Sequence, residues 1–484
     1  MISPAKIYSV MGNPKSLAPL GVKDGANCLG LTTASYVTGK KEEAQDRFID
    51  EAGTEAIWLG SIPAYKKIID KTAFKIAKLD PKYDIRNLDN KDIFEKTKKY
   101  APKGTNIAND IEKIGKNAKT FKALNVLKVL VATGMALASY DILTDLKQKY
   151  TENKIEKRIK ADMAKQEKKA IMNSNKFVMN KNNKDYTAFS SIKKHNNNLS
   201  FKGGVTDFIL DPVKNMYVLD GGITGQRLAK SRDPQEFAGY VIKEGGFLLF
   251  MYYAGQKIMN HLEHRADKKH NKSIALDSRV LEDDKFKQLF KSGEIEKSLN
   301  EFPKYTIEKP KKKGIIQKVK DFFNPPKKTS EQLLKDAELY EYIHNNPDNA
   351  VVKAAKKSDI IENYKVRQKG ILGFFKKKVD TGYIDTRKYI DMDTMRKTHH
   401  RIQKLYNQYK ASGEDIDTFF NGVRKLKRNS IKVNMASSMF ALGVLLPGMM
   451  LAKRILSNDK EFATKKRIRE RLENEKNTTL QTTV

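Results

Sequence analysis

The sequence predicts a mostly α-helical, membrane-associated protein that contains two similar helical units. Apolar residues recur every three or four positions in several segments, which is the spacing of one helix face. Residues 124–143 and 433–452 are two largely apolar segments of twenty residues, with Lys128 and Asp141 as the only charges, both in the first; a helix of that length spans roughly 30 Å of hydrocarbon. Two shorter stretches, EAGTEAIWLGSIPAYKK (residues 51–67) and KEGGFLLFMYYAGQK (residues 243–257), share a layout of acidic residue, glycine, apolar run and lysine.

The composition agrees with this fold class and excludes a disulfide-stabilised protein. Of the 484 residues, 39% are hydrophobic and 31% are charged, and the net charge is +35. Cys28 is the single cysteine, so neither an internal disulfide nor a cysteine-based metal cluster can form. Basic residues occur in nearly every polar segment, which indicates attraction to anionic surfaces in general rather than one binding patch. The first residues lack the basic and apolar regions of a secretory signal, so secretion is not expected.

The first half of the chain is predicted to hold a leader and one helical unit. Residues 1–39 are rich in glycine, proline and serine and are expected to form a loose leader. Residues 40–150 form the first unit, in which Pro63 is expected to kink a helix or to begin a second one. One apolar stripe of this unit consists of Trp58, Ile62, Tyr65, Ile69, Ala73 and Ile76. The apolar segment 124–143 completes the unit.

The rest of the chain divides by composition into four parts. Residues 151–219 are rich in asparagine and lysine and are predicted to form a linker. The second helical unit comprises residues 220–272 together with residues 429–457, which contain the second apolar segment. Between these lies an inserted polar helical subdomain, residues 273–428. A basic tail, residues 458–484, follows.

The order of parts suggests a duplication. Glu51 and Gly53 in the first unit have counterparts in Glu244 and Gly246, and in each unit a long apolar segment follows. Identity between the two copies is low, so the alternative is two unrelated pairs of apolar helices in a mostly helical protein.

The inserted subdomain has recognisable helix ends and two apolar stretches between lysines. Thr329 and Gln332 match a capping box, and Gly413 matches a helix C-terminal cap. The two apolar stretches are predicted membrane anchors, with apolar side chains below and lysines above. These anchors consist of Ile315, Ile316, Val319, Phe322 and Phe323 in one stretch, and of Ile371, Leu372, Phe374 and Phe375 in the other. Alternatively, both are helix ends that pack on the core of the subdomain.

Signals for catalysis or for a cofactor are weak. His261 and His264 lie one helical turn apart and could together bind a metal, although histidines at a helix end are more often only solvated. Glu51, Glu55 and Glu244 lie beside apolar helices, where they would be either functional carboxylates in a membrane or partners of nearby lysines. The glycines of LDGGITGQRL do not have the spacing of a nucleotide-binding loop. The sequence therefore predicts no cofactor and no enzymatic activity.

The resulting hypothesis is a structural or interaction protein located in a membrane. Apolar helices would anchor it, lysines would contact anionic membrane lipid, and the insert would present a surface to a protein partner, with most polar segments in the cytoplasm. Lysine and arginine counts beside the two apolar segments leave the topology open. One alternative is a basic helical protein that binds nucleic acid and keeps the apolar segments in its core. A second alternative is a transporter-like or channel-like membrane protein, because such proteins often contain repeats.

Overall fold

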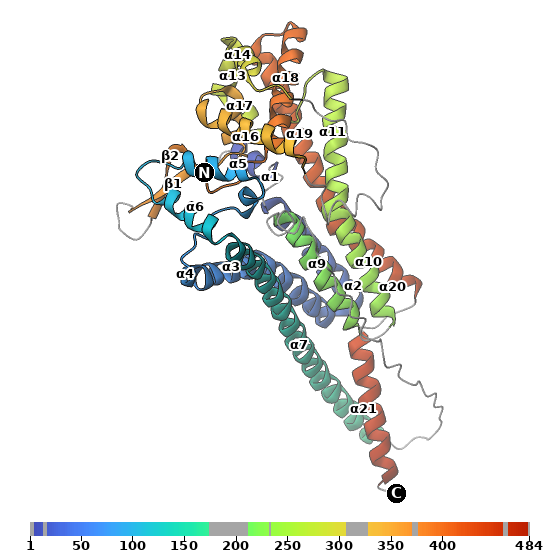
Figure 1. Ribbon diagram of the computed structural model, residues 1–484. Helices are drawn as coiled ribbons and strands as arrows, with labels where there is room; N and C mark the ends of the chain where they lie inside the picture. Colours follow the sequence, from blue (N-terminus) through green and yellow to red (C-terminus); the bar gives the residue numbers. More distant parts are fainter. Residues whose placement is uncertain are drawn as a thin grey trace.

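The computed structural model describes residues 4–12, 17–173, 212–231, 234–305, 328–369, 376–457 and 463–482. The chain is mostly helical, as the sequence predicts. Figure 1 shows three parts: a head of short helices at the top, a bundle of long helices below it, and an arm that extends away from the head. The bundle therefore lies between two parts of the molecule.

The bundle contains the long helices, several of which continue directly into the next through a short π-helical segment. Its elements are α2 (Ala18–Ala56), η1 (Ile57–Ser61), α3 (Ile62–Lys71), α7 (Ala118–Asn173), α9 (Pro212–Ala229), α10 (Pro234–Leu248), η3 (Leu249–Ala254), α11 (Gly255–His270), α19 (Ile416–Phe440), η4 (Ala441–Leu445) and α20 (Leu446–Leu456). The short helix α1 (Pro4–Met11) contacts the start of this bundle.

Helix α2 reverses direction within its length. Trp58 Nε1 donates a hydrogen bond to Asp24 Oδ2 at 3.0 Å, although a straight helix would separate residues 34 positions apart by roughly 50 Å. Thr38 and Glu43 both contact the guanidinium of Arg454, so the reversal lies between them, around Gly39. The predicted boundary at residues 39/40 falls at this reversal. The predicted loose leader is nevertheless wrong for residues 18–38, which form a helix that packs against α19, η4 and α20.

Proline explains two of the three π-helical segments. Pro63 and Pro447 each stand at the second position of the helix that follows, and a proline ring collides with the carbonyl four residues earlier. Those carbonyls belong to Leu59 in η1 and to Gly443 in η4, so a wider turn at these points relieves the collision. Pro63 therefore begins a second helix, as expected from the sequence. No proline follows η3.

Glycines allow the closest helix contacts in the bundle. A Cβ atom on Gly30 would lie 2.3 Å from the carbonyl oxygen of Gly443, so α2 and η4 touch backbone to backbone. Gly53 packs against Leu143 of α7, and Gly246 packs against Leu446 of α20, where added Cβ atoms would lie 2.4 and 2.5 Å from leucine methyl carbons.

The head has two apolar cores and is built from two separate stretches of the chain. Its elements are α4 (Ala73–Ile76), η2 (Ile85–Asp89), α5 (Lys91–Lys99), α6 (Ile107–Lys116), α12 (Ser278–Leu281), α13 (Asp284–Lys291), α14 (Glu294–Glu301), α16 (Ser330–Asn345), α17 (Ala350–Lys357), β1 (Asn363–Lys369), β2 (Lys376–Ile384) and α18 (Met392–Ser412). The larger core includes Phe290 and Tyr340 together with Phe420 from the start of α19, and Ile93 of α5 joins it from the first stretch. The buried residues of the smaller core, such as Phe74 and Tyr83, come from the first stretch alone. The predicted insert, residues 273–428, is therefore only part of a larger body.

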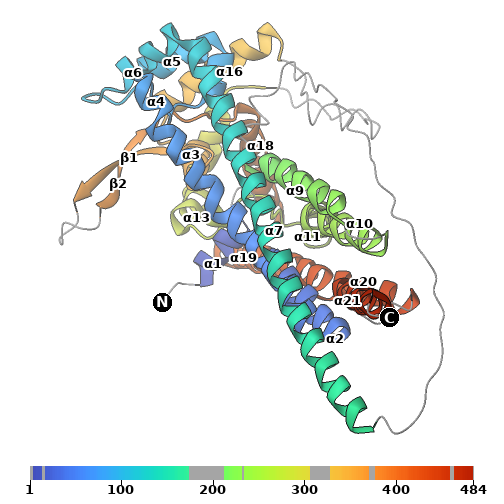
Figure 2. The same ribbon diagram turned by 90° about the horizontal axis from the view of Figure 1, so that it is seen from below.

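The helix ends predicted in the head are confirmed, and the head also contains a β-hairpin that was not predicted. Thr329 and Gln332 form a reciprocal capping box at the start of α16. Gly413 ends α18 with a φ of 65°, a left-handed conformation that glycine adopts without strain. This antiparallel hairpin of β1 and β2 projects from the head in Figure 2.

The arm consists of the last third of α7 and of α21 (Ala463–Thr482), which lie side by side in Figure 1. Ile155 and Ile159 of α7 pack against Ile468 and Leu472 of α21. Residues 151–173 are thus helical, and residues 212–219 begin α9, so the predicted linker is wrong at both of its ends.

Apolar side chains cover the outside of the bundle. Among the described residues, large apolar side chains that are exposed lie almost all on α1, α2, η1, α3, α7, α10, η3, α19, η4 and α20; Ile76, Leu334 and Tyr383 are the exceptions. Two helices, Ala118–Gln166 and Ile416–Leu456, are long and apolar enough to cross a membrane, and their most apolar windows are only 22% and 28% buried.

Candidate functional site

The interior of the bundle contains a cluster of charged side chains, which we call the ionic cluster. Helices α2, α7, α9 and α10 contribute to it. Its members are Asp46, Arg47, Asp50 and Glu51 of α2, Lys147 of α7, Arg227 of α9, and Lys243 and Glu244 of α10. All but Arg47 are less than 9% exposed. Four carboxylates meet four cations, so the buried charges balance.

Arg227 joins three helices at the centre of the cluster. Its guanidinium lies 2.6 Å from Glu244 Oε1 and 3.1 Å from Asp50 Oδ2. It also donates hydrogen bonds to the hydroxyls of Tyr140 at 2.7 Å and Thr54 at 3.1 Å. A planar guanidinium offers donors in several directions at once, and this geometry suits a buried contact with several partners.

Lys243 connects the two glutamates of the similar sequence stretches. Its Nζ lies 2.5 Å from Glu51 Oε1 and 2.9 Å from Glu244 Oε1. The two stretches, about 190 positions apart, therefore meet in one ionic cluster. The sequence analysis weighed functional carboxylates against pairing with nearby lysines, and for these two glutamates the observed contacts are ion pairs.

Two further aspartates border the cluster and accept hydrogen bonds from aromatic side chains. Trp58 of η1 donates to Asp24, and the hydroxyl of Tyr252 in η3 donates to Asp220. Among the described residues, no cation forms an ion pair with either carboxylate. Each half of the bundle thus pairs an aspartate with a ring from its π-helical segment.

A small cavity of about 20 Å³ lies between these groups. Asp24, Glu51, Asp220, Arg227, Lys243 and Glu244 line it together with Thr54, Trp58, Ile223 and Phe247. This volume holds about one water molecule. The arrangement can fix the relative positions of four helices, and it offers two carboxylates without ion-pair partners to a bound water.

Most of this site could not be found from the sequence. The sequence singled out Glu51 and Glu244, but Arg227, Lys147 and Asp50 were missed because their partners lie on other helices. One usable signal existed: Lys243 and Glu244 stand as a charged pair inside an apolar helix, and a buried charge needs a partner from another helix.

The predicted membrane anchors lie outside the described residues. This holds for Ile315, Ile316, Val319, Phe322 and Phe323, and also for Ile371, Leu372, Phe374 and Phe375.

The predicted metal pair lies on the surface of α11. His261 and His264 are both exposed. Within the part of the chain that the structure describes, no three histidine, cysteine, aspartate or glutamate side chains are grouped so that they could hold a metal ion. The structure does not bring a third protein ligand to this pair.

The head contains a second polar contact, where α5 docks onto α16. Glu341 accepts hydrogen bonds from Lys96, from Lys99 at 3.0 Å and from Tyr100 at 3.0 Å, and these bonds lower the pKa of Glu341 to about 2. His344 stacks on Tyr100 with ring centres 4.6 Å apart, and its Nε2 has no hydrogen-bond partner among the described residues. Burial, with a smaller contribution from Lys356, lowers the pKa of His344 to about 4.

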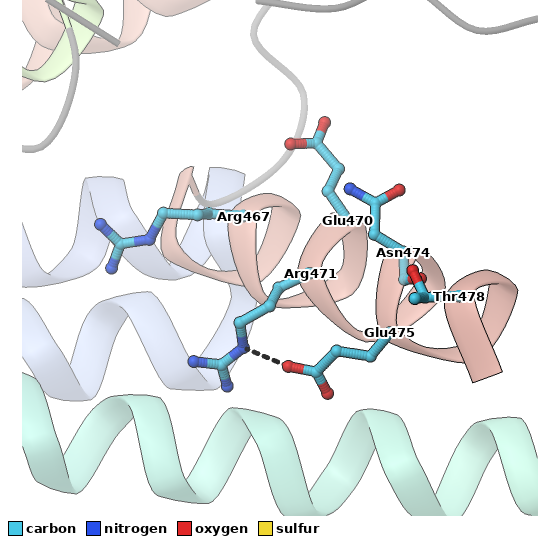
Figure 3. A pocket seen from close by; sticks show the side chains of 6 residues that line it. All are labelled: Arg467, Glu470, Arg471, Asn474, Glu475 and Thr478. Carbon is cyan, nitrogen blue, oxygen red and sulfur yellow. Dashed lines mark hydrogen bonds and ion pairs between the residues drawn. The ribbon is translucent and has the colours of Figure 1, made fainter. Parts of the chain in front are cut away.

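Two surface hollows are less suited to chemistry. One, of about 650 Å³, is open and is lined by six residues of α21 alone; in Figure 3 Arg471 and Glu475 pair along the helix. The other, of about 780 Å³, is an apolar groove between α2 and the η4–α20 helix, with Gly25 and Gly448 among its lining residues. Neither brings together charged groups from different helices.

No family model matches the chain, and neither a curated protein nor a solved structure is similar to it.

Proposed function

We propose that the protein is a non-enzymatic membrane protein whose helical bundle lies in the bilayer and whose head presents an interaction surface in the cytoplasm. One observation carries this proposal: the bundle encloses the ionic cluster, whereas large apolar side chains of α2, α7, η4 and α20 are exposed on its outside. In hydrocarbon an unpaired charge is costly, whereas apolar side chains meet lipid without cost. The reverse arrangement would be expected for a bundle in water.

The shape of the molecule supports the same placement. The apolar outer surface lies between the head and the arm, both of which are polar (Figure 1). On α7 the exposed large apolar side chains extend from Leu127 to Tyr150, which corresponds to roughly 35 Å of helix and is close to the thickness of the hydrocarbon layer. Near the end of this span the half-buried Asp141 and the exposed Asp145 pair with Lys230 at the end of α9. Lysines of the head and arm would then lie near anionic lipid headgroups.

We also propose that the bundle is a duplication of three helical segments. The first copy comprises the two halves of α2, continued by η1 and α3, and then α7; the second comprises α9, then α10 with η3 and α11, then α19 with η4 and α20. Three pairs of contacts support this assignment: Asp24 with Trp58 and Asp220 with Tyr252, Gly53 with Leu143 and Gly246 with Leu446, and Glu51 and Glu244 with Lys243.

Fractionation of cells that express the full chain tests the membrane placement. We expect the protein to stay in the membrane pellet after an alkaline carbonate wash, because embedded helices are not released by pH or salt. Release into the supernatant would contradict the proposal. It would favour the nucleic-acid alternative, which in addition requires salt-sensitive binding to DNA or RNA by a chain that stays soluble without detergent.

A transporter-like function is the second candidate, and the ionic cluster favours it. Buried charges at the boundary between two repeats are typical of ion and proton pathways in transporters. Asp24 and Asp220 border the cavity without an ion-pair partner, so they are the carboxylates that such a pathway would use. Proteoliposomes that contain the chain would show proton or cation uptake that the double substitution Asp24→Asn and Asp220→Asn abolishes; equal uptake by both proteins would exclude this role for the two aspartates.

A further inference from the structure

A second group of buried polar side chains lies where α2 meets α19 and the start of α11. Lys23 and Asn27 stand one turn apart on α2 and are 6% and 1% exposed. Asn434 and Ser438 stand one turn apart on α19, and Ser438 is 2% exposed. Helix α11 completes the group with Gly255, which is also buried. Asp24, the neighbour of Lys23, points instead to Trp58.

The ends of three of these side chains, Lys23, Asn434 and Ser438, surround one point beside α11. A Cβ atom on Gly255 would lie 3.0 Å from Lys23 Nζ, 3.5 Å from Ser438 Oγ and 3.6 Å from Asn434 Oδ1. Because Gly255 has no side chain, an ammonium group, a hydroxyl and an amide converge there from two other helices.

These polar atoms lack partners within the described part of the chain. Both amide atoms of Asn27, the Oδ1 atom of Asn434 and the Oγ atom of Ser438 are buried without a hydrogen bond. No carboxylate forms an ion pair with Lys23, in contrast to Lys147 and Lys243 in the ionic cluster. Buried polar atoms are nearly always hydrogen-bonded, and a buried ammonium without a counter-charge is costly, so several such groups at one point indicate a missing partner.

We propose that Lys23, Asn27, Asn434 and Ser438 form a binding site for a small monovalent anion such as chloride or formate. The ammonium would supply the opposite charge, and the hydroxyl and amide groups would donate hydrogen bonds. The amide of Asn434 can present its nitrogen by turning about its last bond. Because Gly255 has no side chain, the backbone of α11 can lie beside these groups.

The corresponding place in the second half of the bundle is apolar. If Asp24 corresponds to Asp220, as in the proposed duplication, Lys23 corresponds to Leu219 and Asn27 to Ile223, both of which belong to an apolar core with Trp58 and Ala136. This comparison rests on the duplication, whereas the anion site rests on the contacts around Gly255 alone. The comparison shows only that Lys23 and Asn27 are polar at positions whose counterparts in the second half pack in an apolar core.

The test measures the thermal stability of the full chain in detergent at constant ionic strength, with sodium gluconate exchanged for sodium chloride or sodium formate. We expect a saturable rise in Tm with the small anions, because a ligand that binds only the folded state stabilises it. The variant Lys23→Met should lose this rise. It should also have a higher Tm than the natural chain in gluconate, because it removes a buried charge that has no partner.

Two more variants keep the test decisive. Lys41→Met removes an exposed charge from the same helix, and its dependence on chloride should equal that of the natural chain. Gly255→Ala retains Lys23 but places a methyl group 3.0 Å from its Nζ, so it should weaken anion binding even if Lys23→Met fails to fold. Broadening of the chloride NMR signal by the natural chain, reduced in Gly255→Ala, would give a direct readout.

The proposal is overturned if Tm is the same in chloride, formate and gluconate, or if Lys23→Met keeps the full response. In either case ordered water would be the partner of these groups. The outcome is independent of the membrane proposal, because the group is buried among helices whether or not lipid surrounds the bundle.

Discussion

The head and the bundle of this protein differ in the side chains that they place on their outside. The head encloses aromatic and aliphatic residues such as Phe290, Tyr340 and Phe420, and it exposes its lysines. The bundle encloses Arg227, Lys243 and four carboxylates, and it exposes leucine, valine and methionine. This difference is what the proposed placement requires, with water around the head and lipid around the bundle.

The largest effect is expected from removing the central cation of the bundle. Arg227→Met leaves Asp50 and Glu244 buried without that partner, and breaking a buried ion pair in this way costs about 3–5 kcal/mol of folding free energy. Thermal or denaturant unfolding in detergent measures it. Arg158→Met is the control, because Arg158 pairs with Glu42 at the surface of the arm, where a loss of less than about 1 kcal/mol is expected. Equal losses would mean that the ionic cluster is not essential to the bundle.

A lysine introduced on the outside of the bundle, and another on the outside of the head, test whether lipid or water surrounds each part. Leu130 on α7 is 65% exposed and Leu334 on α16 is 53% exposed. If lipid covers α7, Leu130→Lys costs about 2.5–3.5 kcal/mol of insertion free energy and lowers the fraction retained after a carbonate wash. Leu334→Lys, in the head, should leave that fraction unchanged. The same retention for both variants would contradict a lipid-facing α7.

The head should lose stability in mild acid because of His344. Its pKa in the folded chain, about 4, lies below the ordinary value near 6.5, so the unfolded chain binds the proton more readily. The stability that depends on neutral His344 is therefore complete above pH 6.5 and is lost as the pH falls toward 4. The loss is on the order of 3 kcal/mol at most. His344→Phe keeps a ring against Tyr100 and should flatten the dependence of Tm on pH in this window; an unchanged pH profile would contradict this origin.

The smallest effect is expected at the polar contact between α5 and α16. Glu341→Gln removes the charge to which Lys96, Lys99 and Tyr100 donate, and it should lower Tm slightly. Glu338→Gln on the same helix is the control, because Glu338 is exposed and its change should leave Tm as it is. Limited proteolysis would show whether α5 has become accessible.

The sequence predicted where helices begin and end better than it predicted which helices pack against one another. The capping box at Thr329, the cap at Gly413 and the break at Pro63 depend on a few adjacent residues, so they can be read locally. The reversal of α2 could not be read in this way, because its evidence is a contact between Asp24 and Trp58. The ionic cluster could not be predicted for the same reason. In the sequence Arg227 resembles a surface residue, because its partners Asp50 and Glu244 lie on other helices.

Division of the head between two stretches of the chain has a consequence for synthesis. Tyr100 meets Glu341 across 241 positions, so α5 leaves the ribosome long before its docking partner exists. At ordinary translation rates the delay is roughly 10 to 50 s. During that time the apolar side of α5, including Ile93, has no core to enter. The nascent first half is therefore the stage at which this protein would be most exposed to aggregation and would benefit most from a chaperone.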